Sequence, residues 1–403
     1  RLFVIVGAGA SGNAAAQSLR EAGFQGRIMM ITREKQLPYD RPNLSKDYLE
    51  GKADPAWMPL RSEDFYEEHG IELRRKTEVK RLNIPTKTVT FSDGETVIYD
   101  KLLIASGAVP ANLPVDGANL KKIFTLRTFD DSDAIIKASE DAREAVIIGT
   151  GFIGMETAHS LSRRGLKVTV VSKDSVPFEH VFGQEIGELF RKSHEENGVL
   201  FKMNTGVKKF EGKDAVESVI LSNEEKLKAD LVIVAIGVTP ETGFIQGLEF
   251  AQDGGIPVDK FMKAGEDIYA AGDVARFPFW LTGKDVRIEH WRLAEQLGRV
   301  AGRNMAGKKA AYNSVPFFWT NQAGLYFRYV GHAVNWDDII IDGNVSRKDF
   351  LAYYLKKGVV CAIAGTGRDK ELAAAHELFR TKKMPSPEHI RNHNFKLSEY
   401  LKK

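Results

Sequence analysis

Residues 3–12 read FVIVGAGASG, an apolar run that ends in three glycines at positions 7, 9 and 12. The run predicts a buried strand, a tight turn at Gly7 and a helix packed closely at Gly12, with backbone at Gly9 open to a ligand. The start of such a helix offers free N–H groups and a positive dipole end, which suits a pyrophosphate. We therefore expect a dinucleotide contacted by Gly7, Ala8, Gly9, Ser11 and Gly12.

The same pattern returns at residues 145–154, which read AVIIGTGFIG. A matching apolar strand and glycine turn follows each copy, at residues 102–107 and 231–237. Two such turns imply two dinucleotides and one βαβ-based unit used twice. The residues expected at the second site are Gly149, Gly151, Phe152, Ile153, Gly154 and Gly237.

Composition narrows the class of protein. A chain of 403 residues is too long for one ordinary core, and 43% apolar with 28% charged residues is typical of a soluble globular protein. No apolar run is long enough for a membrane span, and a net charge of +3 does not indicate nucleic-acid binding. No metal site is predicted. The one cysteine, Cys361, excludes an intrachain disulfide, and its apolar strand predicts that it is buried.

A carboxylate after the second strand, Glu34, is placed to hold a ribose through its hydroxyls. The next loop, residues 38–46, reads PYDRPNLSK. It resembles the PYxRPxLSK segment of FAD-dependent pyridine nucleotide oxidoreductases, namely the ferredoxin reductases and the apoptosis-inducing-factor-like flavoproteins. The resemblance implies that Arg41 contacts FAD and that Lys46 lies beside the isoalloxazine ring; by themselves both would be solvated loop charges.

Further motifs follow in the order of that family. Residues 105–107 are similar to its ATG turn, residues 272–273 to its Gly-Asp motif, and residues 289–291, EHW, to the apoptosis-inducing-factor-like branch. The aromatic segment after residue 312 is expected to be core, with Trp319 serving both the core and the flavin. The FAD contacts implied by resemblance are Ala105, Gly107, Arg127, Asp273, His290, Trp291 and Trp319.

The resemblance also places Glu156 near the nicotinamide, paired with Lys46, and we assign these two as the catalytic residues. The alternative for Glu156 is an acid that stabilises a helix N-terminus. Ser172 stands where the family commonly has a glutamate that selects NADH, and the neighbouring Lys173 suits a 2′-phosphate. The predicted cofactors are FAD and NADH, with NADPH as the alternative.

The predicted fold is α/β, with two interleaved Rossmann-like domains and a C-terminal α+β domain. The FAD-binding domain is expected at 1–125 and 249–310, the NAD(P)H-binding domain at 126–248 and the C-terminal domain at 311–403. We expect a monomer or homodimer in the cytoplasm. Because the chain begins with Arg1, directly on its first strand, a mitochondrial location after removal of an upstream segment is the alternative.

The resemblance implies a ferredoxin–NAD(+) reductase-like reaction: hydride transfer from NAD(P)H to FAD, then single electrons to an iron–sulfur protein. That partner would be a ferredoxin or a Rieske-type domain, and the resemblance is compatible with a Rieske-type domain fused upstream in the native chain. A dithiol mechanism is excluded, since no cysteine stands near residues 43–46. Two alternatives stay open: a monodehydroascorbate-type reductase, and an NADH-responsive redox sensor that acts through its assembly.

Overall fold

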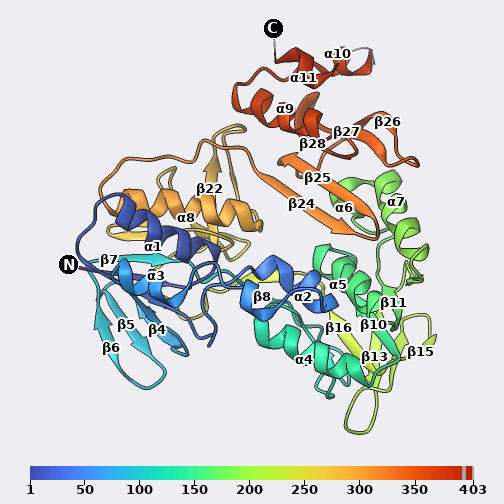
Figure 1. The fold of residues 1–403 in the computed structure, drawn as a ribbon, viewed down its shortest axis with the longest axis horizontal. Coiled ribbons are helices and arrows are strands. Elements are labelled where there is room, and N and C mark those ends of the chain that lie inside the picture. Colours follow the sequence, from blue (N-terminus) through green and yellow to red (C-terminus); the bar gives the residue numbers. More distant parts are fainter. Residues whose placement is uncertain (393–395, 402–403) are drawn as a thin grey trace. The chain divides into compact units, whose positions relative to one another are not determined.

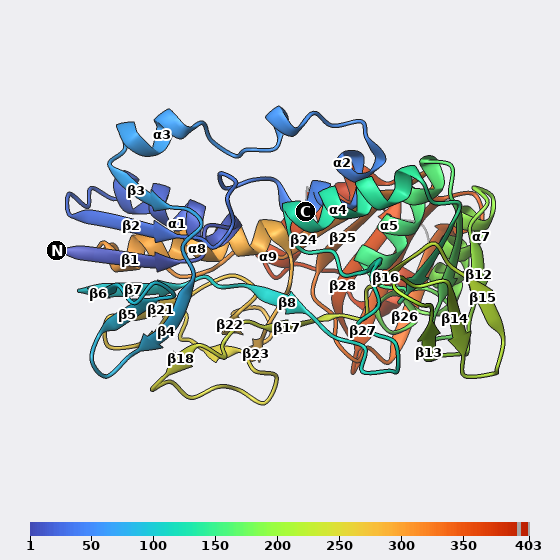
Figure 2. The ribbon, with the colours of Figure 1, turned by 90° about the horizontal axis from the view of Figure 1, so that it is seen from below.

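The computed structural model describes residues 1–392 and 396–401, which form two compact units (Figures 1 and 2). The first unit comprises residues 1–41, 56–109 and 238–314. The second unit comprises residues 42–55, 110–237 and the segment from 315 onward. Residues 402 and 403, the end of the predicted C-terminal domain, lie outside the described residues.

A six-stranded sheet forms the centre of the first unit, with β20 antiparallel at one edge and the other strands parallel. In spatial order the strands are β20 (Lys263–Gly265), β21 (Ile268–Ala270), β7 (Lys101–Ile104), β1 (Leu2–Val6), β2 (Arg27–Ile31) and β3 (Ile71–Arg74). After β1 the chain continues to β2, which pairs with one edge of β1, while β7 pairs with its other edge. The glycine turn after β1 therefore lies where the strand order reverses, which is where open α/β sheets bind ligands.

The two faces of this sheet pack against different layers, as the alternation of side chains along a strand requires. Phe3 and Ile5 belong to a core cluster with α1 (Ala10–Glu21) and α8 (Trp291–Met305). Val4 and Val6 belong to a second cluster with a smaller sheet. In order, the strands of that sheet are β18 (Ile245–Gln246), β4 (Val79–Asn83), β5 (Thr88–Phe91) and β6 (Thr96–Ile98).

Helices α1 and α8 lie side by side in this unit (Figure 1). Glycines of α8 face the backbone of α1: a Cβ at Gly298 would lie 2.1 Å from the Ser11 backbone oxygen, and one at Gly302 would lie 2.5 Å from that of Ala15. Neither distance is compatible with a real side chain. The helices can therefore touch backbone to backbone, which holds α8 against the start of α1.

The second unit repeats the plan. Its parallel sheet has the order β12 (Leu200–Lys202), β11 (Lys167–Val171), β10 (Glu144–Ile148), β16 (Leu231–Val234) and β9 (Ile123–Phe124). Helix α5 (Phe152–Arg163) follows the second glycine turn. Val146 and Ile148 pack against an antiparallel sheet on one face. The strands of that sheet are β13 (Val207–Glu211), β14 (Ser218–Leu221) and β15 (Lys226–Lys228).

The C-terminal part of the second unit is an antiparallel sheet with helices, so the predicted fold class is confirmed. The strand order is β24 (Phe317–Gln322), β25 (Leu325–Gly331), β28 (Val359–Thr366), β27 (Asp349–Lys356) and β26 (Asp338–Asn344). Helix α9 (Asp369–Arg380) packs on β25 and β28. The prediction that Cys361 is buried is wrong: it is half-buried, because it shares a face of β28 with Val359, which is 63% exposed.

The remaining elements are short or connect these sheets. They include the helices α2 (Asp47–Glu50), α3 (Glu63–Glu68), α4 (Phe129–Glu140), α6 (Glu179–Phe182), α7 (Gln184–Glu195), α10 (Pro387–Arg391) and α11 (Leu397–Tyr400), and the 3-10 turns Arg41–Ser45 and Pro55–Trp57. The short strands are β8 (Ala108–Pro110), β17 (Val238–Pro240), β19 (Ile256–Pro257), β22 (Ala275–Phe279) and β23 (Lys284–Val286). Across residues 1–392 and 396–401, no helix has the length and apolarity needed to cross a membrane.

The contact between α1 and α8 gives a stability prediction. Gly298→Ala places a methyl group 2.1 Å from a backbone oxygen, so we expect the free energy of unfolding to fall by about 2 kcal/mol. The measurement is the midpoint of urea unfolding. Gly243→Ala is the control, because a Cβ there meets no described atom within 4 Å. Equal midpoints for both variants would contradict this account of the contact.

Candidate functional site

The first cradle is the turn between β1 and α1. A Cβ at Gly7 would lie 2.1 Å from the backbone oxygen of Ala105, whereas a Cβ at Gly9 would meet no described atom within 4 Å. Gly9 is also the N-cap of α1 and has no side chain to cap the helix. The buried Ser11 hydroxyl finds no hydrogen-bond partner within the part of the chain that the structure describes. Open space, uncapped N–H groups and this hydroxyl fit a pyrophosphate.

Other predicted members of this cradle lie close by. Ala8 and Ala105 are buried, and Gly107 has a φ of +69°. A Cβ at Gly12 would lie 1.8 Å from the Gly7 backbone oxygen, so Gly12 serves helix packing as expected. The turn after β21 also reaches this place, because a Cβ at Gly272 would lie 3.1 Å from the Ser11 Cβ. This contact brings the half-buried Asp273 to the start of α1.

Glu34 follows β2 and is held by two neighbours. Its Oε1 lies 2.6 Å from Nη2 of Arg41, and its Oε2 accepts a hydrogen bond of 2.6 Å from the Tyr39 hydroxyl. Burial alone would lower the pKa of Arg41, but Tyr39, Glu34 and the charge of Asp273 raise that pKa above its usual value. Three of the charged residues predicted for FAD, namely Glu34, Arg41 and Asp273, therefore form one charge cluster in the first unit.

The predicted pair His290 and Trp291 begins α8: His290 is its N-cap residue, and both are half-buried. Three other residues predicted for FAD, Lys46, Arg127 and Trp319, belong to the second unit. Arg127 is half-buried and precedes α4, where its backbone N–H donates to Asp131. Trp319 lies on β24 and is 44% exposed, so the expectation that it also fills the core is wrong.

The second cradle, between β10 and α5, repeats the first. Gly149 has a φ of +110°, as Gly7 does, and a Cβ there would lie 2.1 Å from the Ala235 backbone oxygen. A Cβ at Gly151 or at Gly237 would meet no described atom within 4 Å. Gly154 packs on Gly149 and Ile153 is 39% exposed. The ring of Phe152 instead packs among aromatic neighbours, with Phe178 and Phe318 both at 4.9 Å between centroids.

Past the end of β11 the structure places a carboxylate that the sequence analysis did not single out. Ser172 is buried, and its Oγ accepts the backbone N–H of Asp174 at 3.2 Å. The chain thereby folds back, so that Asp174 Oδ2 lies 3.4 Å from Ser172 Oγ and 3.5 Å from Thr150 Oγ1 in the glycine turn. Lys173 is exposed, and its stem lies against Gly206. A carboxylate, that of Asp174, thus lies two residues after Ser172, the position at which the family commonly has a glutamate.

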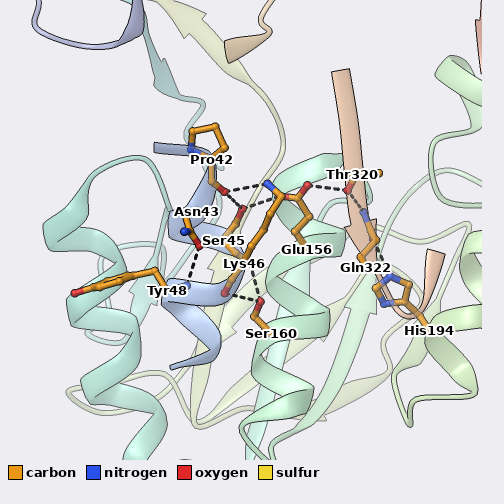
Figure 3. Close-up of polar contacts among 10 residues, drawn as sticks. All are labelled: Pro42, Asn43, Ser45, Lys46, Tyr48, Glu156, Ser160, His194, Thr320 and Gln322. Carbon is orange, nitrogen blue, oxygen red and sulfur yellow. Dashed lines mark hydrogen bonds and ion pairs between the residues drawn. The ribbon is translucent and has the colours of Figure 1, made fainter. Parts of the chain in front are cut away.

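The predicted ion pair between Lys46 and Glu156 is present, with Nζ of the lysine 2.9 Å from Oε2 of the glutamate (Figure 3). Glu156 lies on α5 and is only 4% exposed. Its Oε2 also accepts a hydrogen bond of 2.6 Å from Ser45 Oγ, and its Oε1 accepts one of 2.8 Å from Thr320 Oγ1. A buried carboxylate needs such donors, because desolvation otherwise disfavours its charge.

Sequence reasoning missed Ser45, Thr320 and Asp174. Each lies within two residues of one that it named: Ser45 precedes Lys46, Thr320 follows Trp319, and Asp174 is two residues after Ser172. The only signal in the sequence was this proximity. The hydrogen bonds themselves join residues more than one hundred positions apart in two of these cases.

Comparisons with known proteins agree with this geometry. The family model described as pyridine nucleotide-disulphide oxidoreductase matches residues 2–298, and the one described as reductase C-terminal matches residues 317–401. The chain is 36% identical over 380 residues to apoptosis-inducing factor 3 of Homo sapiens. The aligned region covers 93% of this chain and 62% of that protein. The chain thus spans less than two thirds of the length of that relative.

Other relatives match over nearly their whole length. The 5,5'-dehydrodivanillate O-demethylase ferredoxin reductase subunit of a Sphingobium strain is 34% identical, over 93% of this chain and 92% of that protein. The crystal structure of the covalent putidaredoxin reductase–putidaredoxin complex contains a chain with a TM-score of 0.93 and 30% identity, over 100% of this chain and 98% of that one. Its two glycine cradles, its fold and these matches show that the chain belongs to the pyridine nucleotide-disulphide oxidoreductase family.

Proposed function

We propose that this chain is an FAD-dependent reductase that takes a hydride from NADH and passes single electrons to a small iron–sulfur protein of the ferredoxin type. The observation that carries the proposal is a pair of separate nucleotide cradles in a chain whose one cysteine, Cys361, lies in the C-terminal sheet. A family member that reduces disulfides needs a thiol beside its flavin. Relatives named as ferredoxin reductases, and a similar reductase solved with putidaredoxin, support an iron–sulfur acceptor.

In this proposal the first cradle holds FAD. The start of α1 and the Ser11 hydroxyl would bind its pyrophosphate, and Asp273 would accept hydrogen bonds from its sugar-like chain. Glu34 and Arg41 would hold the adenosine end, and the N-terminus of α8 would favour negative charge on the reduced ring. When bound, FAD accepts a hydride and releases electrons singly, which is the chemistry that the protein itself lacks.

The second cradle would hold NADH. Its ribose would be bound by Asp174, whose carboxylate lies where Rossmann domains place the acid that binds ribose hydroxyls. The side chain of Asp174 is 35% exposed, so it is accessible to a ligand. A carboxylate at this point repels a 2′-phosphate, which favours NADH over NADPH.

The Lys46–Glu156 pair would face the nicotinamide. One cation and two hydroxyl groups surround the buried Glu156 carboxylate, so both of its oxygens have donors. Lys46 is itself held in place, since its Nζ also donates to the Pro42 backbone oxygen at 2.9 Å. Because both side chains are fixed by other hydrogen bonds, the pair is preorganised and can orient a substrate without a change of conformation.

A second candidate function is a redox sensor that changes its assembly on slow reduction by NADH. Its support is the similarity to apoptosis-inducing factor 3, with 36% identity. The two functions differ in the fate of the reduced flavin, which must pass electrons quickly in a reductase and must persist in a sensor.

That difference gives the first functional prediction. Under anaerobic stopped flow, we expect NADH to bleach the flavin absorbance of the FAD-loaded protein quickly and added ferredoxin to restore it at once. NADPH should act much more slowly. Slow bleaching by NADH to a long-wavelength charge-transfer species that resists ferredoxin would contradict the reductase and support the sensor.

The choice of nicotinamide has its own test. In Asp174→Asn the repulsion of a 2′-phosphate is removed, so the ratio of kcat/KM for NADPH to that for NADH should rise on the order of tenfold. Asp174→Glu keeps the charge and serves as the matched control. If the ratio stays unchanged in Asp174→Asn, then Asp174 does not face the ribose.

The buried ion pair predicts a loss of stability when one partner is removed. Lys46→Met leaves the Glu156 carboxylate without its cation, and we expect the free energy of unfolding to fall by about 3 kcal/mol. Adding Glu156→Gln should recover most of the loss in urea unfolding. Lys52→Met is the control: Lys52 pairs with Glu50 at 2.6 Å but is 59% exposed, so its loss should have little effect. Equal losses for Lys46→Met and Lys52→Met would show that burial of the pair has no energetic role.

A further inference from the structure

A line of buried polar side chains continues from Glu156 into the C-terminal sheet and ends on α7 (Figure 3). The Thr320 hydroxyl lies 2.8 Å from Glu156 Oε1 and 2.8 Å from Gln322 Nε2. On the other side of the Gln322 amide, Oε1 lies 2.8 Å from His194 Nε2. All four residues are buried, with Thr320 and His194 fully so.

The direction of every hydrogen bond in this line follows from its first member. An ionised Glu156 can only accept, so the single hydroxyl proton of Thr320 points to it. Thr320 must then accept from the NH₂ group of Gln322, which turns the amide oxygen of Gln322 toward His194. That oxygen can only accept, and therefore Nε2 of His194 carries a proton.

The far end of the line agrees with a neutral histidine. His194 Nδ1 is buried and finds no hydrogen-bond partner within residues 1–392 and 396–401. Burial lowers the pKa of His194 to about 4, although the hydrogen bond with Gln322 acts in the other direction. His194 is thus a neutral donor at neutral pH, and its proton is on Nε2.

We propose that Thr320, Gln322 and His194 are positioning residues that aim the Glu156 carboxylate, with His194 held as the Nε2–H tautomer. The inference rests on the proposed function, in which the Lys46–Glu156 pair orients NADH. Ser45 and Lys46 hold Oε2, whereas this line holds Oε1, so rotation of the carboxylate breaks contacts on both sides. Thr320 and Gln322 are two residues apart on β24 and therefore point to one face of the sheet.

The kinetic test compares isosteric and conservative variants at Thr320. Thr320→Val removes the hydroxyl and keeps the shape, so NADH should reduce the flavin about tenfold more slowly in anaerobic stopped flow. Thr320→Ser restores the hydroxyl and should return the rate to near that of the wild type. Thr366→Val is the matched control: Thr366 is buried in β28 of the same sheet, but its hydroxyl is outside this line. A wild-type rate in Thr320→Val, or an equally slow rate in Thr320→Ser, would overturn the proposal.

The tautomer provides a readout that does not depend on turnover. Long-range ¹H–¹⁵N spectra of protein labelled with ¹⁵N-histidine, with the His194 signals identified by their loss in His194→Gln, should show a neutral Nε2–H ring at pH 7. In Gln322→Leu the acceptor is gone, and this signal should shift or split between tautomers. An Nδ1–H or a charged ring in the wild type would overturn the proposal. If NADH fails to reduce the wild-type flavin, the proposed function fails, whereas the tautomer can still be determined.

Discussion

In each nucleotide-binding repeat, a glycine in the turn after the first strand touches the backbone oxygen of an alanine at the end of a neighbouring strand. Gly7 meets Ala105 and Gly149 meets Ala235, and in both places a Cβ would lie 2.1 Å from that oxygen. Both glycines have a φ of +110°, which disfavours other residues. This contact brings the ends of two parallel strands together under the start of a helix. The helix N-terminus is thereby presented to open space at Gly9 and Gly151, where a dinucleotide can lie.

The second constraint is the burial of the Glu156 carboxylate. Glu156 has only 4% of its surface exposed, and its two oxygens are satisfied by Ser45, Lys46 and Thr320. These donors come from the loop before α2 and from β24 of the C-terminal sheet. Burying a carboxylate without hydrogen-bond donors costs free energy of folding. The burial of Glu156 on α5 therefore requires that the loop before α2 and strand β24 pack against it. The polar line from Thr320 to His194 extends that link to α7.

Prediction from the sequence succeeded best where function depends on local backbone geometry. The two cradles and the α/β class follow from glycine spacing and from the apolar strands that precede the glycines, whereas the antiparallel order of the C-terminal sheet was not predicted. The Lys46–Glu156 pair was expected only through the resemblance of residues 38–46 to a known family. Two expectations about burial failed, those for Cys361 and Trp319, because an apolar or aromatic strand of an antiparallel sheet still has one face toward solvent.

By itself, the sequence determined that two dinucleotide cradles exist, that they come from one repeated unit and that no cysteine occurs around residues 43–46. Those conclusions rest on neighbours in the chain, whose geometry is set by local steric rules. Only the tertiary structure decided which polar side chains meet Glu156, since its hydrogen bonds span 111 positions to Ser45 and 164 to Thr320. It also decided that the Asp174 carboxylate lies beside Ser172 and Thr150, because that depends on how the chain folds back after β11. Contacts of this kind depend on how distant segments pack against one another, and no single segment of the sequence determines that packing.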